Sequence, residues 1–178
     1  MKLSRRARRA TLVTHLAFSA GWLGLSLALL ALAVTAATTR QPETVATSYR
    51  SMRVFTDWLI LPLSLTTLAT GLVLSLGTPW GLLRHRWVVT KFCLTLAATT
   101  ASIFAFRPEV SAAAARVTSG QPVESTIDLV LPPAVSLTTY VFITAVSVLK
   151  PWGLTRRGRN IRASAGKAVD AKGVRQTA

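Results

Sequence analysis

The thirty residues from Ala10 to Thr39, ATLVTHLAFSAGWLGLSLALLALAVTAATT, contain no charged side chain. About twenty consecutive apolar residues cross the hydrocarbon core of a bilayer as an α-helix. In lipid only helices and closed barrels satisfy every backbone hydrogen bond, and this run is far too long for one strand of a barrel. The stretch therefore predicts a transmembrane helix.

Three further apolar runs follow the first. Residues 58–83 and 129–149 are uncharged, and the run 87–106 contains a single charge, that of Lys91. A chain of 178 residues has room for one domain. The sequence thus predicts an all-α, polytopic membrane protein with a four-helix transmembrane domain over residues 1–154. Its spans are expected near 10–37, 54–77, 87–106 and 128–149.

A secretory signal is the alternative interpretation of the N-terminus. The basic segment MKLSRRARR (Met1–Arg9) is followed by apolar and small residues, as in a signal peptide. Apolar cores of signal peptides are about 7–15 residues long, and this run is roughly twice as long. Its length favours a retained helix.

The positive charge lies on one side of the predicted spans. Sixteen of the 21 Lys and Arg residues precede the first span, lie between the second and third or just inside the third, or follow the fourth. By the positive-inside rule, both termini are expected in the cytoplasm and the protein in the inner (plasma) membrane. Such residues near anionic headgroups contribute about 1 kcal/mol each, so an anionic bilayer surface is the expected partner.

The segment 155–178 is basic and poor in large apolar residues, which predicts a disordered cytoplasmic tail. A net charge of +15 would suggest nucleic acid in a soluble domain. Here the charges flank apolar spans, and the tail has no aromatic pattern for stacking on bases. No nucleic-acid partner is expected.

A tryptophan turn occurs twice, as PWGLLRHR from Pro79 and PWGLTRRGR from Pro151. At an offset of 72, ten of the twenty-one residues 64–84 are identical to residues 136–156. The fourth span therefore looks like a copy of the second. A weaker match aligns the first span with the third, so we expect a duplicated helix pair in parallel repeats.

Small and polar residues recur at helical spacing in the spans. Small residues let helices approach closely in lipid, which favours a compact bundle and would suit a homo-oligomer. These small residues are Ala20, Gly24 and Ala28 in the first span and Ala97, Ala101 and Ala105 in the third. Hydroxyl stripes beginning at Ser64 and Ser136 either line a cavity or, more often, bond to carbonyls of their own helix.

Two ionisable residues inside the spans are the candidates for chemistry, His15 and Lys91. Each has a structural alternative: His15 as a hydrogen-bonded interior histidine, and Lys91 as a side chain that extends to the interface. The weak repeat places both at equal depth, which predicts that they meet across an interface of spans one and three. Trp22 would then form the apolar wall of a cavity lined by Ser19, Ser26, Thr95 and Ser102.

Signals for catalysis are weak. Paired carboxylates, a nucleophile elbow and a phosphate-binding glycine loop do not occur, and Cys93 is the single cysteine. Whether the protein is an enzyme stays open on this basis. Asp57 is expected to pair with Arg53 one turn earlier, and RPEVSAAAARVTSGQP predicts a short helix from Pro108 to Gly120.

The segments HLAFSAGWLG and TPWGLLRHRWVVTK resemble a family of small bacterial integral membrane proteins of unknown function. More distantly, His15–x6–Trp22 and Trp87–x3–Lys91 are similar to segments of the HemJ-type protoporphyrinogen oxidases and the CopD copper-resistance superfamily. That resemblance implies a haem-associated site at His15, Lys91 and Trp22, with His15 as a metal ligand.

Three functions remain as expectations. A membrane component without enzymatic activity is favoured, and a haem- or porphyrin-binding redox protein is the alternative. A transporter of small solutes or metals is expected less, because no span carries several buried charges.

Overall fold

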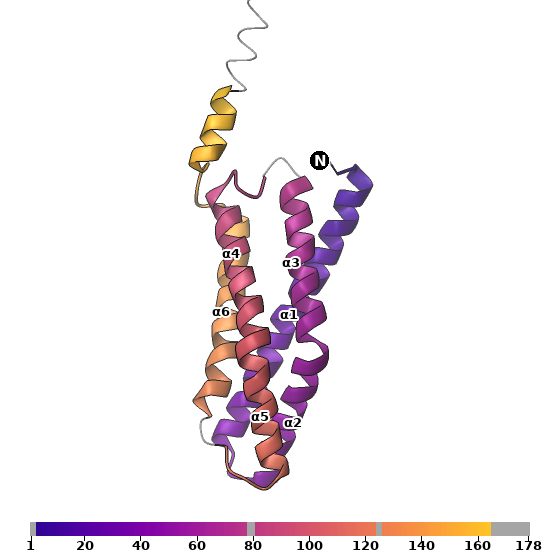
Figure 1. Cartoon of the computed structure of the whole chain (residues 1–178), viewed down its shortest axis with the longest axis vertical. Helices are drawn as coiled ribbons and strands as arrows, with labels where there is room; N and C mark the ends of the chain where they lie inside the picture. The colour runs from indigo at the N-terminus through magenta and orange to yellow at the C-terminus, as the bar shows by residue number, and fades with distance from the viewer. Residues whose placement is uncertain (1–2, 78–80, 124–125, 165–178) are drawn as a thin grey trace, which may run out of the picture.

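The computed structural model describes residues 3–77, 81–123 and 126–164, and every helix and turn below lies in these ranges. All regular elements in the described ranges are helices, which confirms the all-α prediction. The elements are α1 (Arg5–Thr38), α2 (Pro42–Trp58), α3 (Ile60–Gly77), α4 (Arg86–Ala101), the π-helix η1 (Ser102–Phe106), α5 (Arg107–Thr118) and α6 (Ile127–Leu149). Residues 156–164 form one more helix, which lies beyond the end of the bundle (Figure 1).

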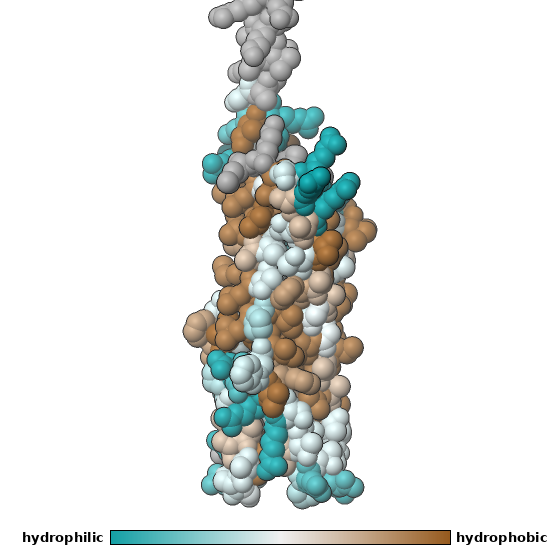
Figure 2. All heavy atoms as spheres, turned by 90° about the vertical axis from the view of Figure 1, so that its right-hand side faces the viewer, coloured by the Kyte–Doolittle hydropathy of each residue, from teal (hydrophilic) through white to brown (hydrophobic). Residues whose placement is uncertain are grey.

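These elements build four rods that are long and apolar enough to cross a membrane. The rods are Arg5–Thr38, Pro42–Gly77, Arg86–Thr118 and Ile127–Leu149, and each contains one of the predicted spans. On the face shown in Figure 2, hydrophobic side chains occupy the middle of the bundle and hydrophilic ones gather towards its ends. This distribution is the one that a bilayer-spanning bundle requires.

The basic end of the bundle is defined here by residues 3–5, 81–86 and 150–164, and the opposite end is called the far end. At the far end the rods extend beyond the predicted spans. The segment expected to be a loop before residue 54 is mostly helix α2, whose buried residues, Ser48, Tyr49, Met52 and Thr56, recur every three to four positions. The helix predicted from Pro108 to Gly120 forms as α5, but it continues η1 rather than standing alone.

Local chemistry explains where the helices begin and end. The Ser4 hydroxyl accepts a hydrogen bond from the Ala7 amide at 3.2 Å and so caps the start of α1. Pro42 occupies the first turn of α2, where its missing N–H costs nothing. At the end of α6, Lys150 adopts a left-handed backbone (φ 46°), and Pro151 follows it and cannot continue the helix.

The four rods form a ring. In the described structure α1 contacts α3 and α6, and α4 also contacts α3 and α6, whereas α1 and α4 have no direct contact. The pairs α1/α4 and α3/α6 are therefore diagonal. Two parallel copies of a helix pair would give this arrangement, but so does an ordinary antiparallel four-helix bundle. The duplication remains a prediction.

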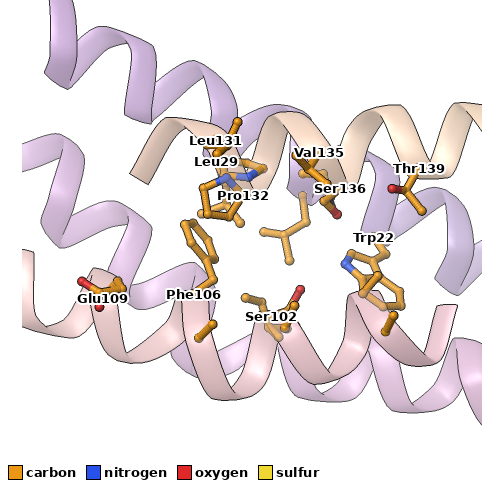
Figure 3. Close-up of a pocket in the computed structure, with 18 of the residues that line it drawn as sticks. Trp22, Leu29, Ser102, Phe106, Glu109, Leu131, Pro132, Val135, Ser136 and Thr139 are labelled. Carbon is orange, nitrogen blue, oxygen red and sulfur yellow. Dashed lines mark hydrogen bonds between the residues drawn. The ribbon is translucent and has the colours of Figure 1, made fainter. Parts of the chain in front are cut away.

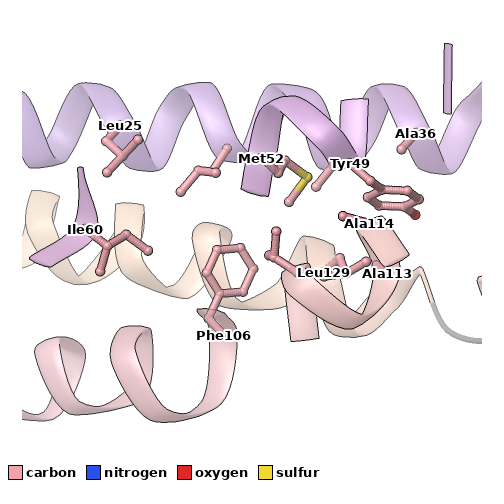
Figure 4. Close-up of a cluster of buried hydrophobic side chains, with 12 residues drawn as sticks. Leu25, Ala36, Tyr49, Met52, Ile60, Phe106, Ala113, Ala114 and Leu129 are labelled. Carbon is pink, nitrogen blue, oxygen red and sulfur yellow. The ribbon is translucent and has the colours of Figure 1, made fainter. Parts of the chain in front are cut away.

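A hydrophobic core fills the far half of the bundle (Figure 4). Met52 from α2 and Val110 from α5 are fully buried, and Phe106 of η1 packs with them. Ala33 of α1 and Ala114 of α5 are also buried in this cluster, so small residues are used here for close packing. The core thus ties α1, α2, α5 and the start of α6 together.

The two predicted small-residue faces do not serve this purpose. Ala20 and Gly24 of α1 are exposed, and a Cβ atom added to Gly24 would meet no atom within 4 Å. Ala97 and Ala101 of α4 and Ala105 of η1 are exposed as well. These faces do not close the described bundle, in which other small residues, such as Ala33 and Ala114, are buried between helices instead. Whether the exposed faces join two copies of the chain stays a prediction.

At the basic end the two tryptophan-turn segments pair with each other. His85 and Leu154 form an isolated antiparallel bridge. The Thr155 amide donates to the Arg84 carbonyl at 3.0 Å, and the Arg86 amide donates to the Gly153 carbonyl at 3.3 Å. Thr78, Pro79 and Trp80 of the first turn lie outside the described residues.

This pairing corrects the prediction for the tail. Its described part is helical over 156–164 rather than disordered, and residues 165–178 lie outside the described ranges. Thr155 begins the helix, because its hydroxyl accepts from the Gly158 amide at 3.1 Å and its carbonyl accepts from the Arg159 amide at 3.0 Å. Thr155 is fixed by its hydrogen bonds to residues 83–84 and caps the first turn of this helix. The composition of the tail alone did not predict this contact.

Candidate functional site

A cavity of about 610 Å³ lies between the α4–η1–α5 rod and α6, with α1 behind it (Figure 3). Its walls are mostly apolar. From the α4–η1–α5 rod they include Leu94, Ala97, Ala98, Ala101, Ser102, Ala105, Phe106 and Glu109; from α6, Asp128, Leu131, Pro132, Pro133, Val135, Ser136 and Thr139; from α1 and α3, Trp22, Leu25, Ser26, Leu29 and Ile60. A large apolar cavity with a few converging polar groups is the usual form of a small-molecule site.

Both facing walls of the cavity contain irregular helix. One wall includes η1, a π-helix of five residues, and such segments are frequent at functional sites. The other includes Pro132 and Pro133 inside α6. Proline has no N–H, so the carbonyls of Asp128 and Leu129 lack the bonds that a regular helix would give them. Irregular backbone inside a membrane is tolerated where it lines a cavity.

Hydroxyl groups supply the polarity in the middle of the cavity. Ser26 of α1 and Ser136 of α6 are hydrogen-bonded to each other, with their Oγ atoms 3.0 Å apart. Ser102 of η1 and Thr139 of α6 also line the space, and the indole nitrogen of Trp22 faces it (Figure 3). The hydroxyls can donate and accept hydrogen bonds, and the indole N–H can donate one, without any of these groups carrying a charge.

Trp22 lines the cavity and is supported by a second aromatic ring from outside the cavity wall. It is 2% exposed and packs edge-on against Tyr140, with ring centroids 4.9 Å apart. The Tyr140 hydroxyl is buried and has no hydrogen-bond partner among the described residues, and the same holds for the hydroxyls of Thr67 and Thr99. A buried hydroxyl without a partner costs about 1–3 kcal/mol, so each of these three groups lowers the stability of the described bundle.

The imidazole of His15 is bound to α3. Its Nδ1 lies 3.1 Å from the Thr67 carbonyl oxygen and 3.0 Å from the Thr70 hydroxyl. The ring also lies against Gly71, where an added Cβ would come within 3.1 Å of the His15 Cε1 atom. His15 is therefore held by helix–helix hydrogen bonds, as in the structural alternative for this residue.

Lys91 is held at the basic end of α4. Its Nζ atom lies 5.4 Å from the centre of the Trp87 ring, a cation–π contact one turn from the start of the helix. The helices that carry His15 and Lys91, α1 and α4, are diagonal in the described bundle and do not pack against each other, so the predicted helix interface between spans one and three is not formed there.

The cavity unites some of the predicted site residues and not others. Trp22, Ser26 and Ser102 line it as expected, whereas His15 and Lys91 do not. The predicted lining residues Ser19 and Thr95 are also absent from its walls. The sequence signals for this site were Pro132, Pro133 and the nearby Asp128 of α6. They could not be found by looking only for ionisable residues inside the spans.

The cavity wall offers no ligand for a haem iron, because none of its residues is a histidine, a cysteine or a methionine. A haem at His15 itself stays a prediction. The described residues also contain no group of three or more His, Cys, Asp or Glu side chains that could hold a metal ion. A haem or metal at His15 gains no support from the arrangement of these side chains.

Other predicted polar contacts hold in part. Arg53 pairs with Asp57 as expected, at 3.6 Å, but the shorter contact comes from Arg107 Nε, which donates to Asp57 Oδ1 at 3.1 Å. The hydroxyls of Ser64 and Ser75 bond to carbonyls within α3. The stripe on α3 therefore follows the alternative in which hydroxyls satisfy their own helix.

The fold and the cavity define a class, that of a helical bundle with an internal cavity between candidate membrane spans. No family model, curated protein or solved structure matches the chain. The resemblance to an uncharacterised bacterial membrane family, and the more distant one to the HemJ and CopD proteins, stay predictions. The cavity is therefore the feature of the described structure that indicates a function.

Proposed function

We propose that the protein is a membrane component without enzymatic activity that binds an apolar or amphiphilic molecule from the bilayer in the cavity. The observation that carries this proposal is the space of about 610 Å³ with largely apolar walls and uncharged hydroxyls at its middle. Such walls favour a hydrocarbon body, and the hydroxyls favour a few polar atoms on it. At mid-depth the walls offer no acid–base pair for a reaction.

The route of entry is sideways, between α4 and α6. On one side of the cavity Ala97 and Ala101 are exposed. On the other side the exposed fractions of Leu131 and Val135 are 57% and 55%. In a bilayer these residues face lipid tails rather than water. A molecule that enters there must already be dissolved in the membrane.

The proposed orientation places the basic end in the cytoplasm of a bacterial cell and the protein in its inner membrane. Residues 3–9, Arg84 and Arg86, and the helix 156–164 belong to the same end of the bundle, which supports the proposal (Figure 1). Reporter fusions after Gly120 and Ala178 test it. A cytoplasmic reporter that is active at Gly120 would reverse the orientation.

Fluorescence quenching tests the binding function directly. A variant with Phe at positions 58, 80, 87 and 152 leaves Trp22 as the single tryptophan of the full chain. Because Trp22 is 2% exposed, brominated phosphatidylcholine in vesicles should quench it only when an acyl chain enters the cavity. Absence of quenching would overturn the proposed function.

A pair of neighbouring substitutions provides the control for this experiment. Ala101→Leu adds bulk to the cavity wall and should lower quenching of Trp22, because the side chain fills the entry between α4 and α6. Thr100→Leu changes an exposed residue of the same helix that does not line the cavity, and it should leave quenching unchanged. Equal effects of both substitutions would point to a general change of α4 instead.

A further inference from the structure

Two carboxylates line the far end of the cavity, Glu109 on α5 and Asp128 in the first turn of α6. Both are exposed, and neither forms an ion pair or a side-chain hydrogen bond with the described residues. Arg107 is close to Glu109 in sequence, but its guanidinium bonds to Asp57 of α2. The two carboxylates at this mouth therefore have no directly paired cation among the described residues.

The position of the two carboxylates matches the head of an amphiphile. Glu109 and Asp128 lie where the rods leave the predicted spans 87–106 and 128–149, which is the level of lipid headgroups. From Asp128, the cavity wall continues along α6 to Thr139, eleven residues on, or about 16 Å at 1.5 Å per residue. This length accommodates a hydrocarbon chain that runs inward from the headgroup level.

We propose, on the basis of the binding function above, that the ligand is a lipophilic cation. Its ammonium head lies at Glu109 and Asp128, and its chain follows η1 and α6 towards Trp22. An anionic head would be repelled by both carboxylates, and a neutral head would leave them without a counter-charge. Phe106, which lines the cavity one turn from Glu109, adds an aromatic surface for a quaternary or protonated amine.

Three probes with the same chain test the charge of the head. They are ω-bromoundecyl trimethylammonium, ω-bromoundecanol and ω-bromoundecanoate, added to the single-tryptophan protein in phosphatidylglycerol vesicles. Quenching of Trp22 is measured against the amount of each probe in the membrane. The cation should bind about tenfold more tightly than the alcohol, and the carboxylate most weakly.

Charge-removing variants locate the head. Glu109→Gln together with Asp128→Asn should abolish the tenfold preference for the cation while the affinity for the alcohol stays the same. Glu43→Gln, at an exposed carboxylate of the far end that does not line the cavity, should keep the preference. Asp128 also lies in the first turn of a helix, where a carboxylate is stabilising. A double variant that melts earlier but keeps the cation preference would assign the carboxylates to helix stability and overturn the proposal.

The results also separate this inference from the function on which it rests. Equal quenching by the cation and the alcohol in the unmodified protein would refute the cationic ligand and leave a neutral amphiphile in the cavity. No quenching by any of the three probes would refute the binding function itself.

Two sources supply the ammonium chemistry, an aminolipid of the bilayer or a free amphiphilic amine. Adding phosphatidylethanolamine to the vesicles distinguishes them, because an aminolipid that occupies the cavity must compete with the cationic probe. Competition assigns the site to a bilayer lipid, and its absence assigns the site to free lipophilic cations. Either result keeps the ammonium head at the carboxylates.

Discussion

Gly158→Ala tests the pairing of the two tryptophan-turn segments. Gly158 lies in the helix 156–164, and a Cβ atom there would collide with the backbone carbonyl of Arg84. It would also come within 3.1 Å of the Arg84 Cγ and Leu154 Cδ2 atoms. A backbone carbonyl cannot move aside as a flexible side chain can, so the helix must move away from residues 83–86.

The size of the effect follows from the hydrogen bonds that are lost. Thr155 donates from its amide to the Arg84 carbonyl at 3.0 Å and from its hydroxyl to the Leu83 carbonyl at 2.7 Å, and the Arg86 amide donates to Gly153 at 3.3 Å. At about 0.5–1 kcal/mol each, their loss costs roughly 2 kcal/mol. Alanine favours a helix over glycine by about 1 kcal/mol, which offsets only part of this loss.

Hydrogen exchange resolved to single amides measures this loss. The Arg86 and Thr155 amides should exchange about 30-fold faster, which corresponds to roughly 2 kcal/mol. Gly153→Ala is the matched control, because a Cβ there meets no atom within 4 Å. If the Arg86 and Thr155 amides exchange as slowly in Gly158→Ala as in the unmodified protein, the close pairing of the two tryptophan-turn segments is refuted.

Three further predictions concern the bundle. Gly71→Ala presses on the His15 ring and should lower the free energy of unfolding by about 1 kcal/mol relative to Gly24→Ala, whose Cβ meets no neighbour, as measured in detergent. Equal stability of the two variants would remove His15 from the α3 contact. Tyr140→Phe deletes a buried hydroxyl without a described partner and should stabilise the protein by about 1 kcal/mol, whereas destabilisation would reveal a bound partner. The purified protein should show no Soret absorption band, and such a band would restore the haem alternative.

The sequence by itself determined the four rods and their approximate limits. Runs of about twenty apolar residues leave the backbone no option in lipid except a helix, so 10–37, 54–77, 87–106 and 128–149 could be predicted without knowledge of the packing. The cap residues likewise act locally, as Pro151 does at the end of α6. The extension of the rods by α2 and α5 was harder to predict. Their composition is as polar as that of loops, and they are stabilised as helices by packing against neighbouring helices.

Tertiary structure alone decided which faces meet. His15 of α1 contacts α3 and not α4, because the ring of helices sets α1 and α4 diagonally. The depth of a residue in the membrane does not determine which helix is its neighbour around that ring. The alanine face of α4 borders a cavity instead of a helix for the same reason. Lipid tails are as apolar as leucine, so hydrophobicity cannot tell an inner face from an outer one, and helix association depends on the fit of particular side chains. The cavity lies where the π-helix η1 of one span faces the prolines of α6 in another. Because its walls come from different spans, it could not be predicted from either span alone.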